Sequence, residues 1–151
     1  IRNSPGSIMS GHGFSKVGQS AKKRLYGPRA LLVCGYAAAE QEALAAMLER
    51  FRLDDLPLVF AAGAEADAKV GELLALPSDH GRGQDSPLPR AVVLSGVTEK
   101  ELSTIMAAWK HLGLPPQNWA TLTPTSETWP LLDLLAELDA ERLALSPRPH
   151  L

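Results

Sequence analysis

One apolar segment occurs twice in this chain: RALLVCGY at residues 29–36 and RAVVLSGV at residues 90–97. The two copies are 61 residues apart, and the same offset continues without a gap, so that Glu40 aligns with Glu101. Much of the match pairs one apolar residue with another, which two units of similar architecture would also share. The ungapped register nevertheless favours a duplication, or at least a repeated supersecondary unit.

Each copy begins a pattern that predicts a strand, a helix, a second strand and a second helix. The first strands are short apolar runs closed by glycine, which is typical of strands buried on both faces. The predicted strands are residues 30–34, 57–62, 91–95 and 119–123. Thr98 and Glu101 have the spacing of a capping box, which predicts the start of a helix there.

The alternation of strands and helices predicts an α/β fold. We expect two tandem β-α-β-α units, residues 29–76 and 90–143, sharing one mostly parallel four-stranded sheet with flanking helices. The predicted strand order is 2-1-3-4, with a pseudo-twofold axis between the units. Residues 77–89, PSDHGRGQDSPLP, are rich in turn-forming residues and are predicted to be an exposed linker.

The two ends of the chain lack this pattern. Residues 1–28 are predicted to be a poorly ordered leader and residues 144–151 a tail. Six of the 15 basic residues lie within residues 1–29, which contain no acidic residue. Residues 30–151 therefore have nine basic and 17 acidic residues, a net charge of −8. A basic leader is the one part of the chain suited to nucleic acid or anionic lipid, although a solubilising tail is the simpler interpretation.

Composition excludes several protein classes. No apolar run approaches the roughly 18–20 residues of a membrane span, which predicts a soluble, cytoplasmic protein with no membrane partner. The single cysteine, Cys34, cannot form an internal disulfide, and the four histidines have no cysteine partners at zinc spacing. We therefore expect no structural metal, and no motif indicates a cofactor.

The sequence contains no recognisable catalytic triad or dyad. No P-loop follows a strand, and the glycines of the leader do not have dinucleotide-binding spacing. Cys34 ends a predicted strand, where a nearby helix could activate a thiol, but a buried structural thiol is the preferred interpretation. An enzyme that uses Cys34 or the threonine-rich turn TPTSET, residues 123–128, stays an alternative.

Open parallel sheets bind ligands beyond the carboxyl ends of their strands, where the strand order reverses. On this analogy a crevice between the first strands of the two units would present backbone N–H groups to a small anion. The predicted binding residues are Gly35, Tyr36, Gly96, Thr98, Thr123 and Thr125.

The second unit resembles a known family. Ser95 and Gly96 close its first strand, and Thr123, Pro124, Thr125 and Trp129 form a turn before a leucine-rich helix. From about Arg90 to Glu141 this pattern resembles the bacterial domain-of-unknown-function family 3783, although Ser126 stands where that family usually has asparagine. The resemblance implies no activity.

These observations predict a non-catalytic binding or regulatory module. Its ligand is expected to be a small anion or a protein partner. A homodimer formed through a sheet edge or a helix face is a third possibility.

Overall fold

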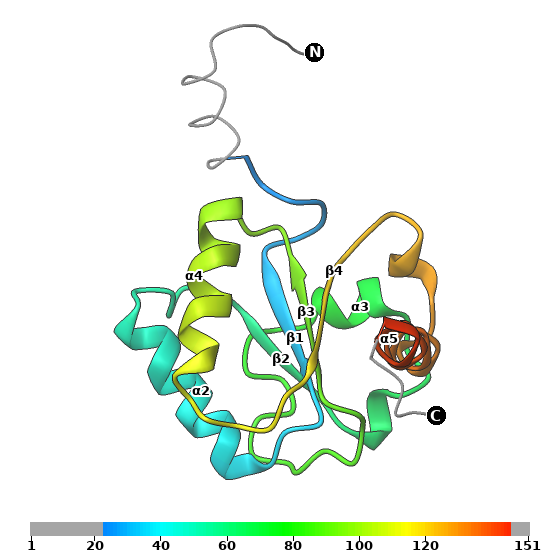
Figure 1. Ribbon diagram of the computed structural model, residues 1–151, viewed down its shortest axis with the longest axis horizontal. Helices are drawn as coiled ribbons and strands as arrows, with labels where there is room; N and C mark the ends of the chain where they lie inside the picture. The colour runs from blue at the N-terminus through cyan, green and yellow to red at the C-terminus, as the bar shows by residue number, and fades with distance from the viewer. Residues whose placement is uncertain (1–22, 146–151) are drawn as a thin grey trace, which may run out of the picture.

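The computed structural model describes residues 23–145 of the chain (Figure 1). Residues 1–22 of the predicted leader (1–28) and residues 146–151 of the predicted tail (144–151) lie outside the described residues. None of the helices within residues 23–145 is both long and apolar enough to cross a membrane.

The described residues form an α/β fold in which each half of the chain contributes the same order of elements. The first half contains β1 (Ala30–Cys34), α2 (Ala38–Arg50), β2 (Leu58–Ala61), a 3-10 turn η1 (Gly63–Glu65) and α3 (Val70–Leu74). The second half contains β3 (Ala91–Ser95), α4 (Glu99–Lys110), β4 (Asn118–Thr121), a 3-10 turn η2 (Ser126–Thr128) and α5 (Leu131–Leu145). The predicted capping box of α4 is present, because Thr98 and Glu101 exchange side-chain to backbone hydrogen bonds.

Helices cover both faces of the sheet (Figure 1). Leu31 and Val33 of β1 pack toward α2 and α4 in one apolar cluster. Leu32 packs on the opposite face, in a second cluster with residues of α3 and α5. Strands β1, β2 and β3 are buried along their whole length, as their continuous apolar runs predict.

The strand order β2-β1-β3-β4 agrees with the prediction, but the sheet is mixed and the expectation of a mostly parallel sheet was wrong. Each half contributes a parallel pair, β1 with β2 and β3 with β4. The central pair, β1 with β3, is antiparallel.

The segment between the halves explains the antiparallel centre. After α3 the chain runs once more along the outer edge of β2, where His80 forms a parallel bridge with Val59. This additional pass returns the chain to the carboxyl end of β1, where Leu88 and Arg90 lie against Gly35. The next strand therefore starts at that end and runs in the opposite direction to β1.

Residues that face each other across the middle of the molecule have the spacing of the sequence repeat. Leu32 pairs with Val93 at the centre of the β1–β3 ladder. On the α3/α5 face, Lys69 forms an antiparallel bridge with Pro130. In both pairs the partners are 61 residues apart.

Candidate functional site

The antiparallel central pair divides the six predicted binding residues between two ends of the sheet. Gly35 and Tyr36 follow β1 at one end. The other four follow β3 and β4 at the opposite end: Gly96, Thr98, Thr123 and Thr125. The structure does not bring the two groups together in one crevice.

Both glycine turns are occupied by neighbouring chain. Gly35 and Gly96 have φ angles of 82° and 65°, which suit glycine. A Cβ on Gly35 would lie 2.5 Å from the carbonyl oxygen of Leu88, and one on Gly96 would lie 2.5 Å from that of Gly27. The amide of Gly35 donates to Ser86 Oγ, and the amide of Gly96 donates to the carbonyl of Tyr26. These N–H groups are therefore already used inside the protein.

The threonine-rich turn after β4 satisfies its own polar groups. The amide of Thr123 donates to Ser126 Oγ over 3.1 Å, and the amide of Ser126 donates to Thr123 Oγ1 over 2.9 Å. Ser126 is buried, whereas Thr125 is exposed. The turn holds the chain in place between β4 and α5.

Tyr36 is a core residue. The residue is 1% exposed, and its hydroxyl accepts a hydrogen bond of 2.9 Å from Trp109 Nε1. The guanidinium of Arg90 lies 4.6 Å from the ring centroid. Burial raises the pKa of the phenol above its ordinary value. The side chain therefore stays neutral and structural near neutral pH.

Two ion pairs join the halves of the chain. Arg29, before β1, contacts Glu101 of α4, and Arg90, before β3, contacts Glu40 of α2, each over 2.6 Å. The hydrogen bond from Arg90 lowers the pKa of Glu40. Burial raises the pKa of Glu101, but its hydrogen bonds with Arg29 and the Thr98 amide outweigh burial and lower it overall. Both carboxylates are therefore charged and paired near neutral pH.

Cys34 is fully buried at the end of β1. Burial raises the pKa of its thiol to about 12, so almost none is ionised at neutral pH. Ser95 at the end of β3 is buried too, and its hydroxyl lies where a side chain on Gly27 would have to be. Neither side chain is presented to a substrate.

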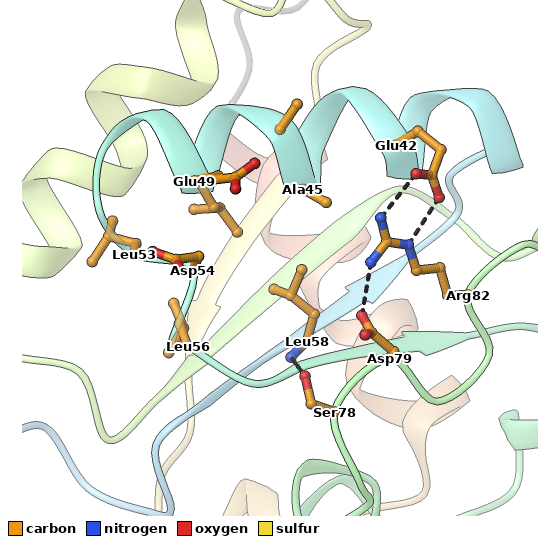
Figure 2. A pocket seen from close by; sticks show the side chains of 12 residues that line it. Glu42, Ala45, Glu49, Leu53, Asp54, Leu56, Leu58, Ser78, Asp79 and Arg82 are labelled. Atoms are coloured by element: carbon orange, nitrogen blue, oxygen red, sulfur yellow. Dashed lines mark hydrogen bonds and ion pairs between the residues drawn. The ribbon is translucent and has the colours of Figure 1, made fainter.

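A cavity of about 350 Å³ lies between α2 and the chain around Ser78–Arg82 (Figure 2). Arg82 spans its rim, pairing with Glu42 over 2.8 Å and with Asp79 over 3.1 Å. The apolar part of the lining comes from residues near the end of α2, including Leu53 and Leu56. Since the guanidinium is already paired with two carboxylates, the cavity has no evident cation for an anionic ligand.

A larger and more apolar hollow of about 530 Å³ follows the exposed edge of β4. We call it the β4-edge groove. One wall is formed by Leu102 and Met106 of α4, and the other by residues of α5. The α5 wall consists of Leu134, Glu137, Leu138 and Glu141, and Leu94 of β3 also lines the groove. The groove further includes residues of β4 and of the turn that follows it: Trp119, Ala120, Thr121, Thr123, Thr125, Ser126 and Trp129.

The two edges of the sheet differ in how they are covered. At β2, Asp79 donates to the carbonyl of Leu58 over 2.6 Å, and Phe60 donates to the carbonyl of His80 over 2.8 Å. The whole of β2 is buried. At β4 no described segment lies along the outer edge, and its residues are intermediate or exposed.

The hydrogen bonds between β4 and β3 show which backbone N–H and C=O groups of β4 point away from the sheet. Asn118 donates to the carbonyl of Arg90, and Leu122 donates to that of Leu94. Alternation along a parallel strand then turns the backbone groups of Trp119 and Thr121 away from β3. These are the groups that a further strand would pair with.

Sequence reasoning included Thr123 and Thr125, which line this groove, but missed its apolar walls. The available signal was that the predicted strand at residues 119–123 is less apolar than the other three. A strand of this kind is expected at a sheet edge with one side uncovered.

Comparison with known proteins agrees with the resemblance of the second unit. Residues 90–145 match the family model described as "Domain of unknown function (DUF3783)". The matched segment begins just before β3 and ends with α5, so it contains β4 and both walls of the groove. Neither a curated protein nor a solved structure matches the chain.

Proposed function

We propose that the chain is a non-catalytic binding or regulatory module that binds a protein partner in the β4-edge groove. The observation that carries this proposal is the uncovered edge of β4 between apolar walls from α4 and α5. Unpaired edges are places where other chains add to a sheet, and native proteins usually cover or charge them. A groove of about 530 Å³ is also within the size range of ligand sites.

We further propose that the halves are tandem units related by a pseudo-twofold axis through the centre of the sheet. The support is a set of interactions that occur twice with the repeat offset. The amide of Val70 donates to the carbonyl of Trp129, and the amide of Leu131 donates to that of Ala68. The Arg29–Glu101 and Arg90–Glu40 pairs are related in the same way. Under this relation β4 corresponds to β2, whose edge the chain itself covers.

The small-anion alternative has less support. The amides of Gly35 and Gly96 are bonded within the protein, and the predicted residues lie at opposite ends of the sheet. The enzyme alternative would need Cys34 or the threonine-rich turn to act. A buried thiol with a pKa of about 12 favours a structural role for Cys34. In the turn, the hydroxyl of Thr123 donates to that of Ser126, and both hydroxyls accept from backbone amides, which favours a structural role there too.

The proposal is tested by photocrosslinking in the native cell. A benzoylphenylalanine at Met106, in the groove wall, is expected to form an adduct with a partner protein. The matched control is the same group at Phe51, which is 45% exposed beyond α2 and away from the groove. The partner is then purified and its affinity measured for Thr121→Arg, which fills the groove, and for Thr128→Arg, outside it.

Binding lost in Thr121→Arg and kept in Thr128→Arg supports the proposal. No adduct at Met106, or equal binding by both variants, contradicts it. Thermal stabilisation of the chain by a small anion, in a panel that includes phosphate and sulfate, would favour the anion alternative.

A further inference from the structure

We infer that the occupant of the β4-edge groove is an extended, basic segment of a partner protein, which adds to the sheet as a strand parallel to β4. This inference rests on the proposed function and specifies its ligand. The covered edge of β2 supplies the backbone geometry. Two exposed carboxylates of α5 supply the charge.

The segment at residues 78–80 is the pattern for the added strand. On β2 it provides a carbonyl for the amide of Phe60, an amide for the carbonyl of Leu58, and the hydroxyl of Ser78 for the amide of Leu58. The residues of β4 at the same repeat offset are Trp119 for Leu58 and Thr121 for Phe60. A partner strand would then accept from the Thr121 amide and donate to the Trp119 carbonyl, as in peptide recognition by strand addition.

Up to residue 145 the second half makes no such pass, because its last helix is longer. Helix α3 ends at Leu74, and the chain then turns to run along β2. Helix α5 continues to Leu145, ten residues beyond Leu135, the position that matches Leu74. Within residues 23–145 no later segment returns to the edge of β4. The edge is therefore not covered by any part of the chain that the structure describes.

Charge determines the kind of segment. Glu137 and Glu141 lie on the α5 wall, both are exposed, and neither forms a salt bridge within residues 23–145. A strand with lysine or arginine side chains directed to this wall would neutralise them, while an apolar side chain contacts Trp119 and Met106. Pairing of β4 with β4 of a second copy would instead bring like charges together, which disfavours that occupant.

The test uses the full chain and a fluorescein-labelled peptide, Ser-Lys-Val-Lys-Val-Lys. Binding is measured by anisotropy, and backbone amide exchange by NMR. We expect the peptide to slow exchange at Trp119 and Thr121, whose amides face outward, and not at Ala120, whose amide already faces β3. A peptide with glutamate in place of lysine should bind at least about tenfold more weakly, because its carboxylates would be repelled by Glu137 and Glu141.

Two controls isolate the backbone hydrogen bonds. Two peptides are N-methylated at alternate residues, one at the odd and one at the even positions. In one of them the methyl group removes the N–H that would donate to the Trp119 carbonyl, and that peptide is expected to bind about tenfold more weakly than the other. Thr121→Pro removes one outward N–H, a change that edge strands accept, and Thr121→Val keeps it. We expect only the proline variant to lose the peptide, with its circular dichroism spectrum unchanged.

Each outcome decides the inference. Peptide binding without slowed exchange at Trp119 and Thr121, or equal binding of both N-methylated peptides, overturns strand addition. A homodimer in sedimentation that Thr121→Pro dissociates would assign the groove to a second copy and overturn it as well. If these tests fail while the Met106 adduct forms with a different protein, and that partner is lost in Thr121→Arg and kept in Thr128→Arg, the proposed function stands and only the description of its ligand is wrong.

Discussion

Arg90 contacts Glu40 over 2.6 Å, and the same guanidinium lies 4.6 Å from the ring centroid of Tyr36. One side chain of the second half thereby contacts both the first turn of α2 and Tyr36, the second residue after β1. The side chains of both ion-pair partners are about one-fifth exposed, at 22% and 21%. The contact is thus partly removed from water, where hydrogen bonds to charged groups are stronger than at the surface.

The first prediction concerns acid stability. The hydrogen bond from Arg90 lowers the pKa of Glu40 below its ordinary value of 4.5. A carboxyl with a lowered folded-state pKa contributes stability that is present above the unfolded pKa and is lost as pH falls through the folded pKa. Glu40→Gln should therefore be less stable than the wild type at pH 7, by about 1–3 kcal/mol, and the difference should shrink below pH 4.5. Urea unfolding at several pH values measures it.

Glu49→Gln serves as the control for that series, because Glu49 is an exposed residue of the same helix. Its effect should be within about 0.5 kcal/mol at every pH. A pH-independent loss in Glu40→Gln would mean that the ion pair does not stabilise the charged carboxylate.

The second prediction compares two glycines with the same backbone conformation. Gly96 and Gly113 both have a φ angle of 65°. A Cβ on Gly96 would lie 2.5 Å from the carbonyl oxygen of Gly27, whereas one on Gly113 would have nothing within 4 Å. Gly113→Ala should cost about 1–2 kcal/mol through backbone strain alone, and Gly96→Ala clearly more. Equal losses in urea unfolding would show that the turn after β3 has room for a side chain.

Local patterns predicted some elements well. The limits of β1 and β3 agree with the apolar runs closed by Gly35 and Gly96, because a strand buried on both faces must be apolar throughout. The order of the strands also followed from short connections within each half.

The direction of the central pair could not be predicted in this way. It depends on residues 78–80 pairing with β2, and a polar segment with glycine and proline nearby has no periodicity that indicates such a contact. The helical spacing of Leu44, Met47, Leu48 and Phe51 in the sequence predicts one shared apolar face, but Phe51 is 45% exposed. The helix ends at Arg50, and Arg52, with a φ of 61°, turns the chain there. The helical spacing therefore does not continue to Phe51.

The candidate groove was equally difficult to predict, since its walls come from α4 and α5 on opposite faces of the sheet. Met106 and Leu138 read as ordinary core positions at helical spacing. They lie around a hollow because no segment within residues 23–145 runs beside the outer edge of β4, and that is a property of the topology rather than of the local sequence.

The third prediction concerns the thiol of Cys34. Burial raises its pKa to about 12, so at pH 8 only about one molecule in 10,000 carries the thiolate. Iodoacetamide should alkylate the native protein far more slowly than the protein unfolded in urea, as mass spectrometry can follow. Rapid alkylation of the native protein at pH 8 would contradict the burial of this residue and would restore the enzyme alternative.

The last prediction uses the two matching helix starts. Thr98 caps α4 through its hydroxyl, which accepts from the amide of Glu101, whereas Ala37 begins α2 with no side-chain acceptor. The other half of the capping box is the same in both helices. The amide of Ala37 donates to the side chain of Glu40, and the amide of Thr98 donates to the side chain of Glu101. The two starts therefore differ mainly by one hydroxyl.

Thr98→Ala should destabilise the protein by about 1 kcal/mol, and Ala37→Ser should stabilise it by about 0.5–1 kcal/mol. Ala37 is exposed, so the added hydroxyl has room. Ala39→Ser, an exposed change within the same helix, controls for the lower helix propensity of serine and should be slightly destabilising. Equal effects of Ala37→Ser and Ala39→Ser in urea unfolding would contradict this prediction. They would mean that the amide of Glu40 is already satisfied by water, so that a hydroxyl at position 37 adds no stability.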